Sequence, residues 1–372
     1  MPFFALGKSA TYFTVEEARI EKANEANPVM FSVHNDRVQA FEQSLKTIET
    51  LPQLESIVVE HGKRLFKQAV ENIQSSQSYD DRALYWTRLQ MTKLIRANET
   101  YRKLDDTAQN ALMFAFELAS RGVGQTGFGT KTDKKILITG FDPFFLDRNI
   151  EQSNPSGIAA MMLDNKVISH QGKTAEIQSL MVPVRFVDFD QGIIETMLTE
   201  HFAHVDMIAT ISMGREDFDL ERFPGLRRSA KAPGNLNVYT GASSEQPLVP
   251  FLRGEILSGP EFVEFSLPVE AMQKATGPYK VIDNHKVETL QKGKFEAKSL
   301  DELANSTSVN GSGGGYLSNE ISYRSILLRN ALKPNLPVGH IHTPRIKEWK
   351  KAEVKGIVDQ IEGMLKQAIP VI

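Results

Sequence analysis

The chain has 372 residues, which favours two domains over one, because a domain takes roughly 150 residues. Charged residues make up 24 % and hydrophobic residues 41 %, which excludes bulk disorder, while a net charge of −3 without a local basic patch argues against nucleic-acid binding. The chain contains no cysteine, which excludes disulfides, thiolate zinc sites, iron–sulfur clusters and a cysteine nucleophile, and fits a reducing compartment.

At the start of the chain, residues 1–6 lack the basic flank and the long apolar run of a signal peptide. No stretch of 18 or more apolar residues follows anywhere in the sequence. We therefore expect a cytoplasmic protein that does not interact with a membrane.

Residues 14–121 have the pattern of about five successive helices. Thr14 is placed to cap the first helix through its hydroxyl, and Pro28 is expected to end it. Ser78, three residues before Asp81, is a candidate cap for a later helix, whose apolar residues recur at helical spacing.

The last predicted helix of this region covers 106–121, and Gly122 is a plausible C-terminal cap. No cluster of catalytic residue types occurs in these helices. We interpret residues 1–121 as an all-α N-terminal domain for packing or oligomerisation, and a homo-oligomer remains open.

Residues 122–135 are rich in Gly, Thr and Lys without periodicity, which predicts a linker. The segment contains a formal GxGxxG match at 122–127. That pattern binds a dinucleotide only when a strand precedes it and a helix follows, and here the order is reversed. We expect no cofactor.

Beyond the linker, short apolar runs at 136–139, 178–184, 207–211 and 338–341 predict buried strands. Helical stretches at 156–163 and 190–202 lie between them. This alternation predicts an α/β domain over 136–372, a three-layer sandwich with a largely parallel sheet, in which functional groups collect after the strands.

The run TGFDPF at 139–144 directly follows the first strand. Phe141 and Phe144 lie three residues apart in an expected turn and can form a flat apolar slot. Asn154 follows and offers either a hydrogen bond to a ligand amide or a cap for the next helix.

A second group of polar residues follows the strand at 207–211, where Gly214 and Arg215 lead to Glu221 and Arg222. Taken alone, Glu221 beside Arg222 indicates a surface ion pair. Ser318 follows a glycine-rich run at 311–315 and is expected at a helix N-terminus, as an N-cap or as a nucleophile beside free amides.

His340 and His342 point to the same face of a predicted strand, which is the geometry of a metal-binding pair. No acidic partner stands out, so we expect no metal site. His342 could alternatively serve Ser318 as an acid/base group. His201 and His204 are expected to face solvent.

In this order, the motifs resemble those of the pyrrolidone-carboxylate peptidase (pyroglutamyl peptidase) family, cysteine peptidases that remove an N-terminal pyroglutamyl residue. The resemblance covers roughly 134–345. It rests on TGFDPF at 139–144, NPS at 154–156, LMVPV at 180–184, GR at 214–215 with ER at 221–222, FSLPV at 265–269, GGYLSN at 314–319 and GHIHTP at 339–344. His342 lies 24 residues after Ser318, as in the family pattern.

The resemblance implies that Ser318 occupies the position of the nucleophilic cysteine, His342 that of the general base, and Glu221 that of the carboxylate that orients the imidazole. Phe141 and Phe144 fall on the phenylalanines that hold the pyroglutamyl ring, with Asn154 and Arg215 beside them as binding residues. Backbone amides near Ser318 would hold the oxyanion.

The sequence also departs from the family. Ile211 occupies the place of a glutamine, the loop at 145–150 is longer, an insertion lies around 280–306, and the N-terminal helices have no counterpart in the family. The resemblance implies an omega-peptidase-like hydrolase that acts on a peptide substrate through Ser318. Two alternatives stay open, a catalytically inactive homologue that binds a peptide or protein, and a metal-dependent hydrolase using His340 and His342.

Overall fold

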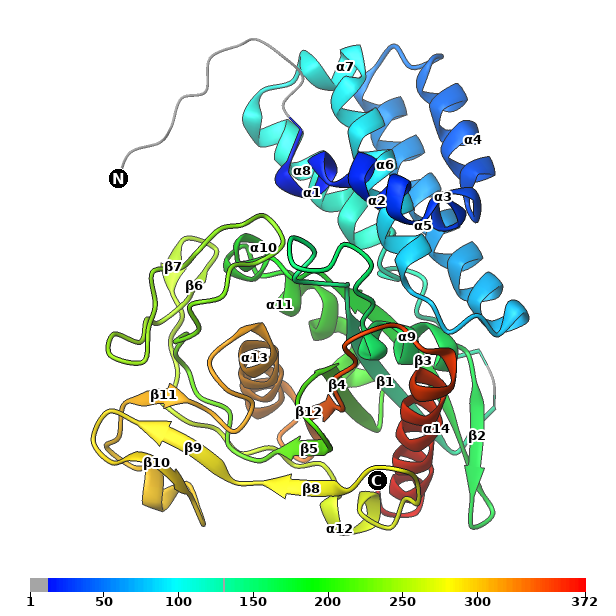
Figure 1. The fold of residues 1–372 in the computed structure, drawn as a ribbon. Helices are drawn as coiled ribbons and strands as arrows, with labels where there is room; N and C mark the ends of the chain where they lie inside the picture. The colour runs from blue at the N-terminus through cyan, green and yellow to red at the C-terminus, as the bar shows by residue number, and fades with distance from the viewer. Residues whose placement is uncertain (1–12, 130) are drawn as a thin grey trace.

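The computed structural model describes residues 13–129 and 131–372 (Figure 1). A helical region is followed by a mixed, mostly parallel sheet with helices on both faces, which confirms the predicted fold class. Residues 1–6, on which the interpretation about a signal peptide rests, lie outside the described residues, as does residue 130 of the predicted linker.

The N-terminal region has more and shorter helices than predicted: within residues 13–129 there are eight, in place of about five. They are α1 (Val15–Ala18), α2 (Ile20–Ala26), α3 (Pro28–Ser32), α4 (Asn35–Leu45), α5 (Leu51–Ser76), α6 (Arg82–Ala97), α7 (Glu99–Arg102) and α8 (Asp106–Ala119). Thr14 caps α1 as predicted.

Two helix boundaries in this region differ from the expectation. Pro28 opens α3 rather than only ending the helix before it, because a proline lacks the N–H that a first helical residue leaves unpaired anyway. The N-cap of α6 is Asp81, not Ser78. The apolar repeat of α6 is buried as its spacing predicts, at Leu84 and Met91 among others.

The main sheet has seven strands in the order β2-β3-β1-β4-β12-β5-β8. Their bounds are β1 (Lys134–Phe141), β2 (Val167–His170), β3 (Lys173–Val182), β4 (Met207–Met213), β5 (Phe218–Glu221), β8 (Val281–Asn284) and β12 (Val338–Thr343). Neighbouring strands are parallel except for β2 with β3 and β12 with β5. The four predicted strands are confirmed as β1, β3, β4 and β12, and β2, β5 and β8 were not predicted.

Helices cover both faces of this sheet (Figure 1). On one face α9 (Pro155–Leu163) packs on β1 and against α14 (Lys351–Ala368), and on the other α13 (Leu317–Leu332) packs on β12 and against α11 (Ile193–Leu198). Gly140 allows the close approach of β1 to α9, since a Cβ there would lie 2.1 Å from the carbonyl oxygen of Ser156.

The remaining elements surround this sandwich. They are α10 (Phe186–Asp190), η1 (Thr199–Ala203), α12 (Val269–Met272), η2 (Asp301–Leu303), η3 (Ile369–Val371), the hairpin β6 (Phe251–Leu252) with β7 (Glu255–Ile256), and a three-stranded sheet of β9 (Lys286–Thr289), β10 (Gly293–Glu296) and β11 (Ser308–Asn310).

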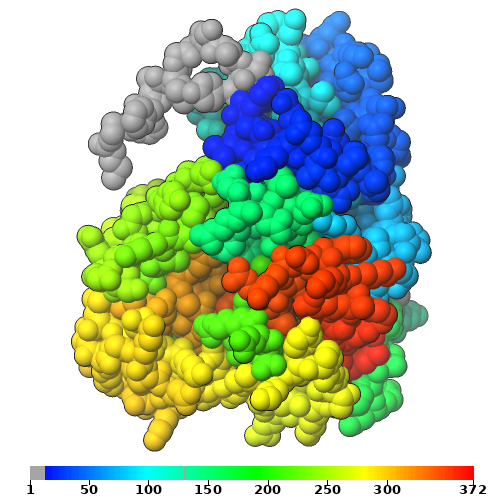
Figure 2. Space-filling model, viewed as in Figure 1, coloured from blue at the N-terminus to red at the C-terminus, as the bar shows by residue number. Residues whose placement is uncertain are grey.

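The N-terminal helices rest on the segment that follows β1, and Figure 2 shows that segment lying between them and the chain that follows β12. One hydrophobic cluster extends from α5, through residues such as Leu65, into the sheet and α9. The chain therefore buries the helices and the sheet in a shared core, and the division into domains at 122–135 stays a prediction.

Buried ion pairs add to this contact. Arg88 of α6 and Arg121, just after α8, both pair with Asp142, and all three side chains are at most 2 % exposed. Arg185, after β3, pairs with Glu16 and Glu117 of the helices. Ion pairs to the N-terminal region therefore hold Asp142, within the Phe141–Phe144 turn, and Arg185, after β3.

None of the helices in the described ranges, 13–129 and 131–372, has the length and apolar character needed to span a lipid bilayer.

Candidate active site

The antiparallel pairing of β12 with β5 places His342 opposite Asp219, which lies two residues before Glu221 on the same face of the sheet. His342 lies near the end of β12 and Glu221 at the end of β5, which runs antiparallel to it. His342 Nδ1 is hydrogen-bonded to Glu221 Oε1, and both side chains are buried. An imidazole held at Nδ1 by a carboxylate keeps Nε2 free to accept a proton.

The expectation of a surface ion pair between Glu221 and Arg222 is wrong. Glu221 is fully buried, and Arg222 instead pairs with Asp283 and Glu264. Side chains alternate across a strand, so two consecutive residues of an extended chain face opposite sides and cannot share one environment.

Asn284 is a site residue that sequence reasoning missed. It ends β8, beside Glu221 in the parallel β5–β8 pair, and its Nδ2 donates to Glu221 Oε2 at 2.9 Å and to the carbonyl of Ser312 at 3.0 Å. The stretch around 280–306 looked like an insertion, and a lone asparagine gives no motif that would place it. The amide fixes the second carboxylate oxygen of Glu221.

Ser318 is the second residue of α13, whose N-cap is Tyr316, so the interpretation of Ser318 as an N-cap is wrong. Its hydroxyl donates to the carbonyl of Gly313 at 3.3 Å. In the described part of the chain, the backbone amides of residues 317–319 have no hydrogen-bond acceptor. These amides lie at the positive end of a 16-residue helix.

The glycine-rich run before α13 is needed mostly for space. Only Gly314 has a left-handed backbone, with φ 88°. A Cβ at Gly311 would lie 2.1 Å from Asn319 Oδ1, and one at Gly315 would lie 1.9 Å from Ser229 Oγ. Asn319 pins the start of α13 by accepting from the amide of Gly225 and donating to its carbonyl.

Gly313 lies next to both Ser318 and His342. Its carbonyl accepts the Ser318 hydroxyl, and a Cβ built on it would lie 3.6 Å from His342 Cε1. Gly214 also lies against this histidine, since a Cβ there would lie 2.6 Å from His342 Cβ. Among the residues described, no hydrogen bond joins Ser318 to His342, and Gly313 is the residue that lies next to both.

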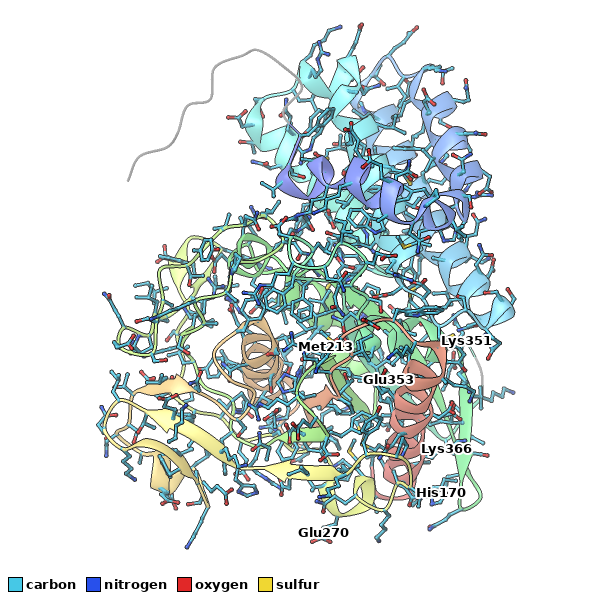
Figure 3. All side chains as sticks on the ribbon, in the orientation of Figure 1. His170, Met213, Glu270, Lys351, Glu353 and Lys366 are labelled. Carbon is cyan, nitrogen blue, oxygen red and sulfur yellow. The ribbon has the colours of Figure 1, made fainter. Side chains whose placement is uncertain are left out.

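A cavity of about 240 Å³ opens beside Ser318. Phe141 and Phe144 both line it, as the sequence predicted, and Phe145 lies against Phe144 with 4.5 Å between ring centroids. Met213, at the end of β4, lines it beside α13 (Figure 3). The other lining residues are Asn154, Val184, Ser212, Gly214, Ala230, Ala232, Tyr316, Leu317, Ser318 and Arg345.

Of the two other predicted binding residues, Asn154 lies at the cavity and Arg215 does not. Asn154 lines the cavity, but its oxygen caps α9 by accepting from the amide of Ser156, and its Nδ2 donates to the carbonyl of Asp142. Arg215 does not line the cavity, and its side chain is 55 % exposed and faces Asp219 at 3.5 Å. Arg345, in contrast, is one of the residues that line the cavity.

His340 is fully buried and has partners at both ring nitrogens, Thr210 Oγ1 at Nδ1 (2.8 Å) and Ser212 Oγ at Nε2 (2.7 Å). Burial, together with the neighbouring His342, holds its pKa well below the ordinary value. No group of three or more potential metal ligands occurs in the described parts of the chain. His201 is buried, contrary to the expectation, while His204 is exposed.

Comparison with protein families gives two matches. The family described as the PA0049 N-terminal domain matches residues 5–117, and the PA0049, C-terminal domain matches residues 135–256 and 281–347. The uncharacterized protein PA0049 of Pseudomonas aeruginosa is 27 % identical, with 79 % of this chain and 70 % of that protein covered.

Solved structures similar to this chain include pyrrolidone carboxyl peptidase of Pyrococcus furiosus, 21 % identical, covering 63 % of this chain and 98 % of that chain with a TM-score of 0.42. Pyroglutamyl peptidase I of Bacillus amyloliquefaciens is also 21 % identical, covering 64 % and 98 % with a TM-score of 0.44.

Proposed function

This chain belongs to the PA0049 family, and we propose that it is a hydrolase that cleaves the amide bond after an N-terminal pyroglutamyl or related cyclic-amide residue of a peptide. We place the reaction in the cytoplasm, the compartment expected from the sequence. The observation that carries the proposal is the His342–Glu221 pair, whose imidazole neighbours Gly313, the acceptor of the Ser318 hydroxyl, and Gly214, which lines the aromatic cavity.

In the proposed reaction, Ser318 Oγ attacks the pyroglutamyl carbonyl while His342 Nε2 takes the hydroxyl proton. The hydroxyl must first leave the carbonyl of Gly313, which a rotation about χ1 of Ser318 accomplishes. His342 then gives the proton to the leaving amine. Water, deprotonated by the same imidazole, hydrolyses the acyl ester and restores the serine.

Glu221 has a positioning role in this proposal. It holds the imidazole by Nδ1 and stabilises the imidazolium that forms during attack, while Asn284 prevents the carboxylate from rotating away. The unpaired amides of residues 317–319 suit the oxyanion of the tetrahedral intermediate, because preorganised donors need no rearrangement when charge develops.

Substrate choice would come from Phe141 and Phe144. A five-membered lactam is flat and largely apolar on its faces, and the cavity places aromatic walls beside the nucleophile. The volume of about 240 Å³ is below the roughly 300–1,000 Å³ of pockets for drug-sized ligands, which favours a small ring over a bulky side chain.

A second candidate function is binding without catalysis. Two observations favour it: the Ser318 hydroxyl bonds the carbonyl of Gly313 rather than His342, and a hydroxyl is much harder to deprotonate than a thiol of pKa about 8.5. In that case the cavity would capture a peptide N-terminus and release it unchanged.

The test is turnover of a fluorogenic pyroglutamyl amide by the full chain. We expect hydrolysis that is lost in Ser318→Ala and in His342→Ala but retained in Ser169→Ala, a matched exposed serine on β2. Absence of turnover, even in Ser318→Cys, would overturn the hydrolase and favour the binding function instead. Turnover that a chelator abolishes would overturn both and implicate the histidine pair.

A further inference from the structure

Arg345 is the only charged residue among the described residues that line the cavity beside Ser318. The rest of the wall is aromatic, aliphatic or neutral polar. Arg345 comes three residues after His342, and its backbone amide donates to the carbonyl of Arg215 at 2.7 Å. The chain therefore holds the base of this side chain at the cavity rim.

The guanidinium of Arg345 has no partner of its own. In the described part of the chain, no hydrogen bond or ion pair reaches it, whereas nearby guanidiniums are matched, Arg215 by Asp219 and Arg222 by Asp283. Its side chain is exposed. A cation left unmatched on the wall of an otherwise neutral cavity is available to an anionic group of a ligand.

We infer that the cavity selects substrates that carry a carboxylate close to the scissile bond, and that Arg345 binds it. This rests on the proposed function, since it names the part of the substrate that follows the cyclic residue. A guanidinium matches a carboxylate with two parallel hydrogen bonds, which a single ammonium cannot form.

The size of the cavity limits where the carboxylate sits. About 240 Å³ admits little beyond a lactam ring and the next residue. The carboxylate is therefore either the α-carboxylate of a pyroglutamyl dipeptide or the side chain of an acidic residue directly after the ring. Both sources share the same chemistry, and separate ligands distinguish them.

The experiment measures binding by calorimetry in Ser318→Ala, which cannot hydrolyse the ligand through residue 318. The ligands are pyroglutamyl-alanine, its C-terminal amide, and pyroglutamyl-glutamate with an amidated C-terminus. We expect one or both acids to bind about tenfold tighter than the neutral amide, as one charge-assisted pair at a partly solvated site provides.

Variants at position 345 show whether the preference for acids depends on the Arg345 guanidinium. Adding Arg345→Gln should abolish the preference, and adding Arg345→Lys should keep part of it, because the charge remains while the paired donors are lost. Lys347→Gln is the matched control: this residue is exposed, carries the same charge, and does not line the cavity. Salt at about 0.5 M should weaken the preference in the parent.

Equal binding of acids and amide, a preference that survives Arg345→Gln, or no binding of any of the three ligands would overturn the inference. Hydrolysis of the neutral fluorogenic amide by the unmodified chain is a separate readout. An acid preference without turnover would refute the hydrolase and leave the inference standing. Turnover without a preference for the acids would overturn the inference about Arg345 and leave the proposed hydrolase standing.

Discussion

Glu221 has no carboxylate oxygen free. One oxygen holds His342 and the other accepts from Asn284, in a fully buried position. Such an arrangement orients an imidazole more firmly than a solvated carboxylate could, because the low local dielectric strengthens each bond and rotation of the carboxylate would break two of them.

Glu221→Gln should lower kcat for a pyroglutamyl amide by at least about a hundredfold with a small change in KM, because the amide cannot stabilise the imidazolium. Steady-state kinetics measure the split. Glu264→Gln is the matched control, since Glu264 is 40 % exposed and pairs with Arg222 outside the cavity. A kcat within about threefold of the parent would contradict the positioning role.

A second prediction at the level of single residues concerns His34, at the start of α4. Burial lowers the pKa of His34 to about 4, so the folded chain keeps it neutral while the unfolded chain takes up a proton below about pH 6.5. The unfolded state is then favoured as the pH falls. The free energy of unfolding should drop by about 2 kcal/mol from this residue between pH 7 and pH 5.

Urea unfolding of the parent and of His34→Gln at the two pH values measures this contribution. The parent should lose more stability on acidification than the variant, by about 2 kcal/mol. His204→Gln replaces an exposed histidine and should behave like the parent. The same loss in His34→Gln as in the parent would show that another group is responsible.

At the scale of elements, the turn after β1 is held by buried ion pairs with the N-terminal region. Asp142 lies between Phe141 and Phe144 and receives two buried guanidiniums, Arg88 and Arg121, from the N-terminal helices. Buried ion pairs often add little net stability, but removing one partner is costly because the remaining charges stay buried.

Asp142→Asn should therefore lower the free energy of unfolding by about 3–5 kcal/mol and raise KM for a pyroglutamyl amide more than it lowers kcat. Denaturant unfolding and steady-state kinetics measure the two effects. Asp359→Asn, on α14, removes a carboxylate that is 52 % exposed and whose partner Lys355 is 50 % exposed, and should cost less than about 1 kcal/mol. Equal losses in the two variants would refute the special role of Asp142.

The elements also show where sequence reasoning succeeds and where it fails. Apolar runs such as that of β1 are visible in the sequence because both faces of a central parallel strand are buried. β5 and β8 were missed because they are short and carry polar residues at the positions that build the site, Glu221 and Asn284. The polar residues that build the candidate site are therefore the ones that remove the strand signal.

In the candidate site too, residues in a motif beside a recognisable strand could be predicted, and isolated polar residues could not. Phe141 and Phe144 were found because their motif follows a recognisable strand, and the structure places both on one cavity. Arg345 and Asn284 were not found, because a lone polar residue acquires meaning only from its neighbours across the fold. The proposed roles of Ser318, His342 and Glu221 remain to be tested by the variants above.

In the whole molecule, the helices and the sheet share buried contacts as well as a core. Trp349, near the C-terminal helix, donates from Nε1 to the carbonyl of Tyr79 at 2.6 Å, across a separation of 270 residues. Trp86 is the other tryptophan of the chain and is buried in α6. Trp349 therefore reports on the contact between the C-terminal segment and the N-terminal region, and Trp86 reports on α6.

We expect the chain to unfold in one cooperative transition. Trp86→Phe leaves Trp349 as the fluorescent probe, and Trp349→Phe leaves Trp86. Within each variant, the midpoint measured by tryptophan fluorescence should coincide with that measured by far-ultraviolet circular dichroism. Separate midpoints in either variant would mean that the helices and the sheet unfold independently, as the predicted linker would allow.

The two arginines that hold Asp142 come from helices that the pyroglutamyl peptidase motifs do not include. Any heritable change in the Phe141–Phe144 turn must therefore keep an acid for Arg88 and Arg121, or leave two buried guanidiniums without a partner. Over evolutionary time the turn and the helices should change together. A turn grafted from a protein without these helices would need a matching acid to be tolerated.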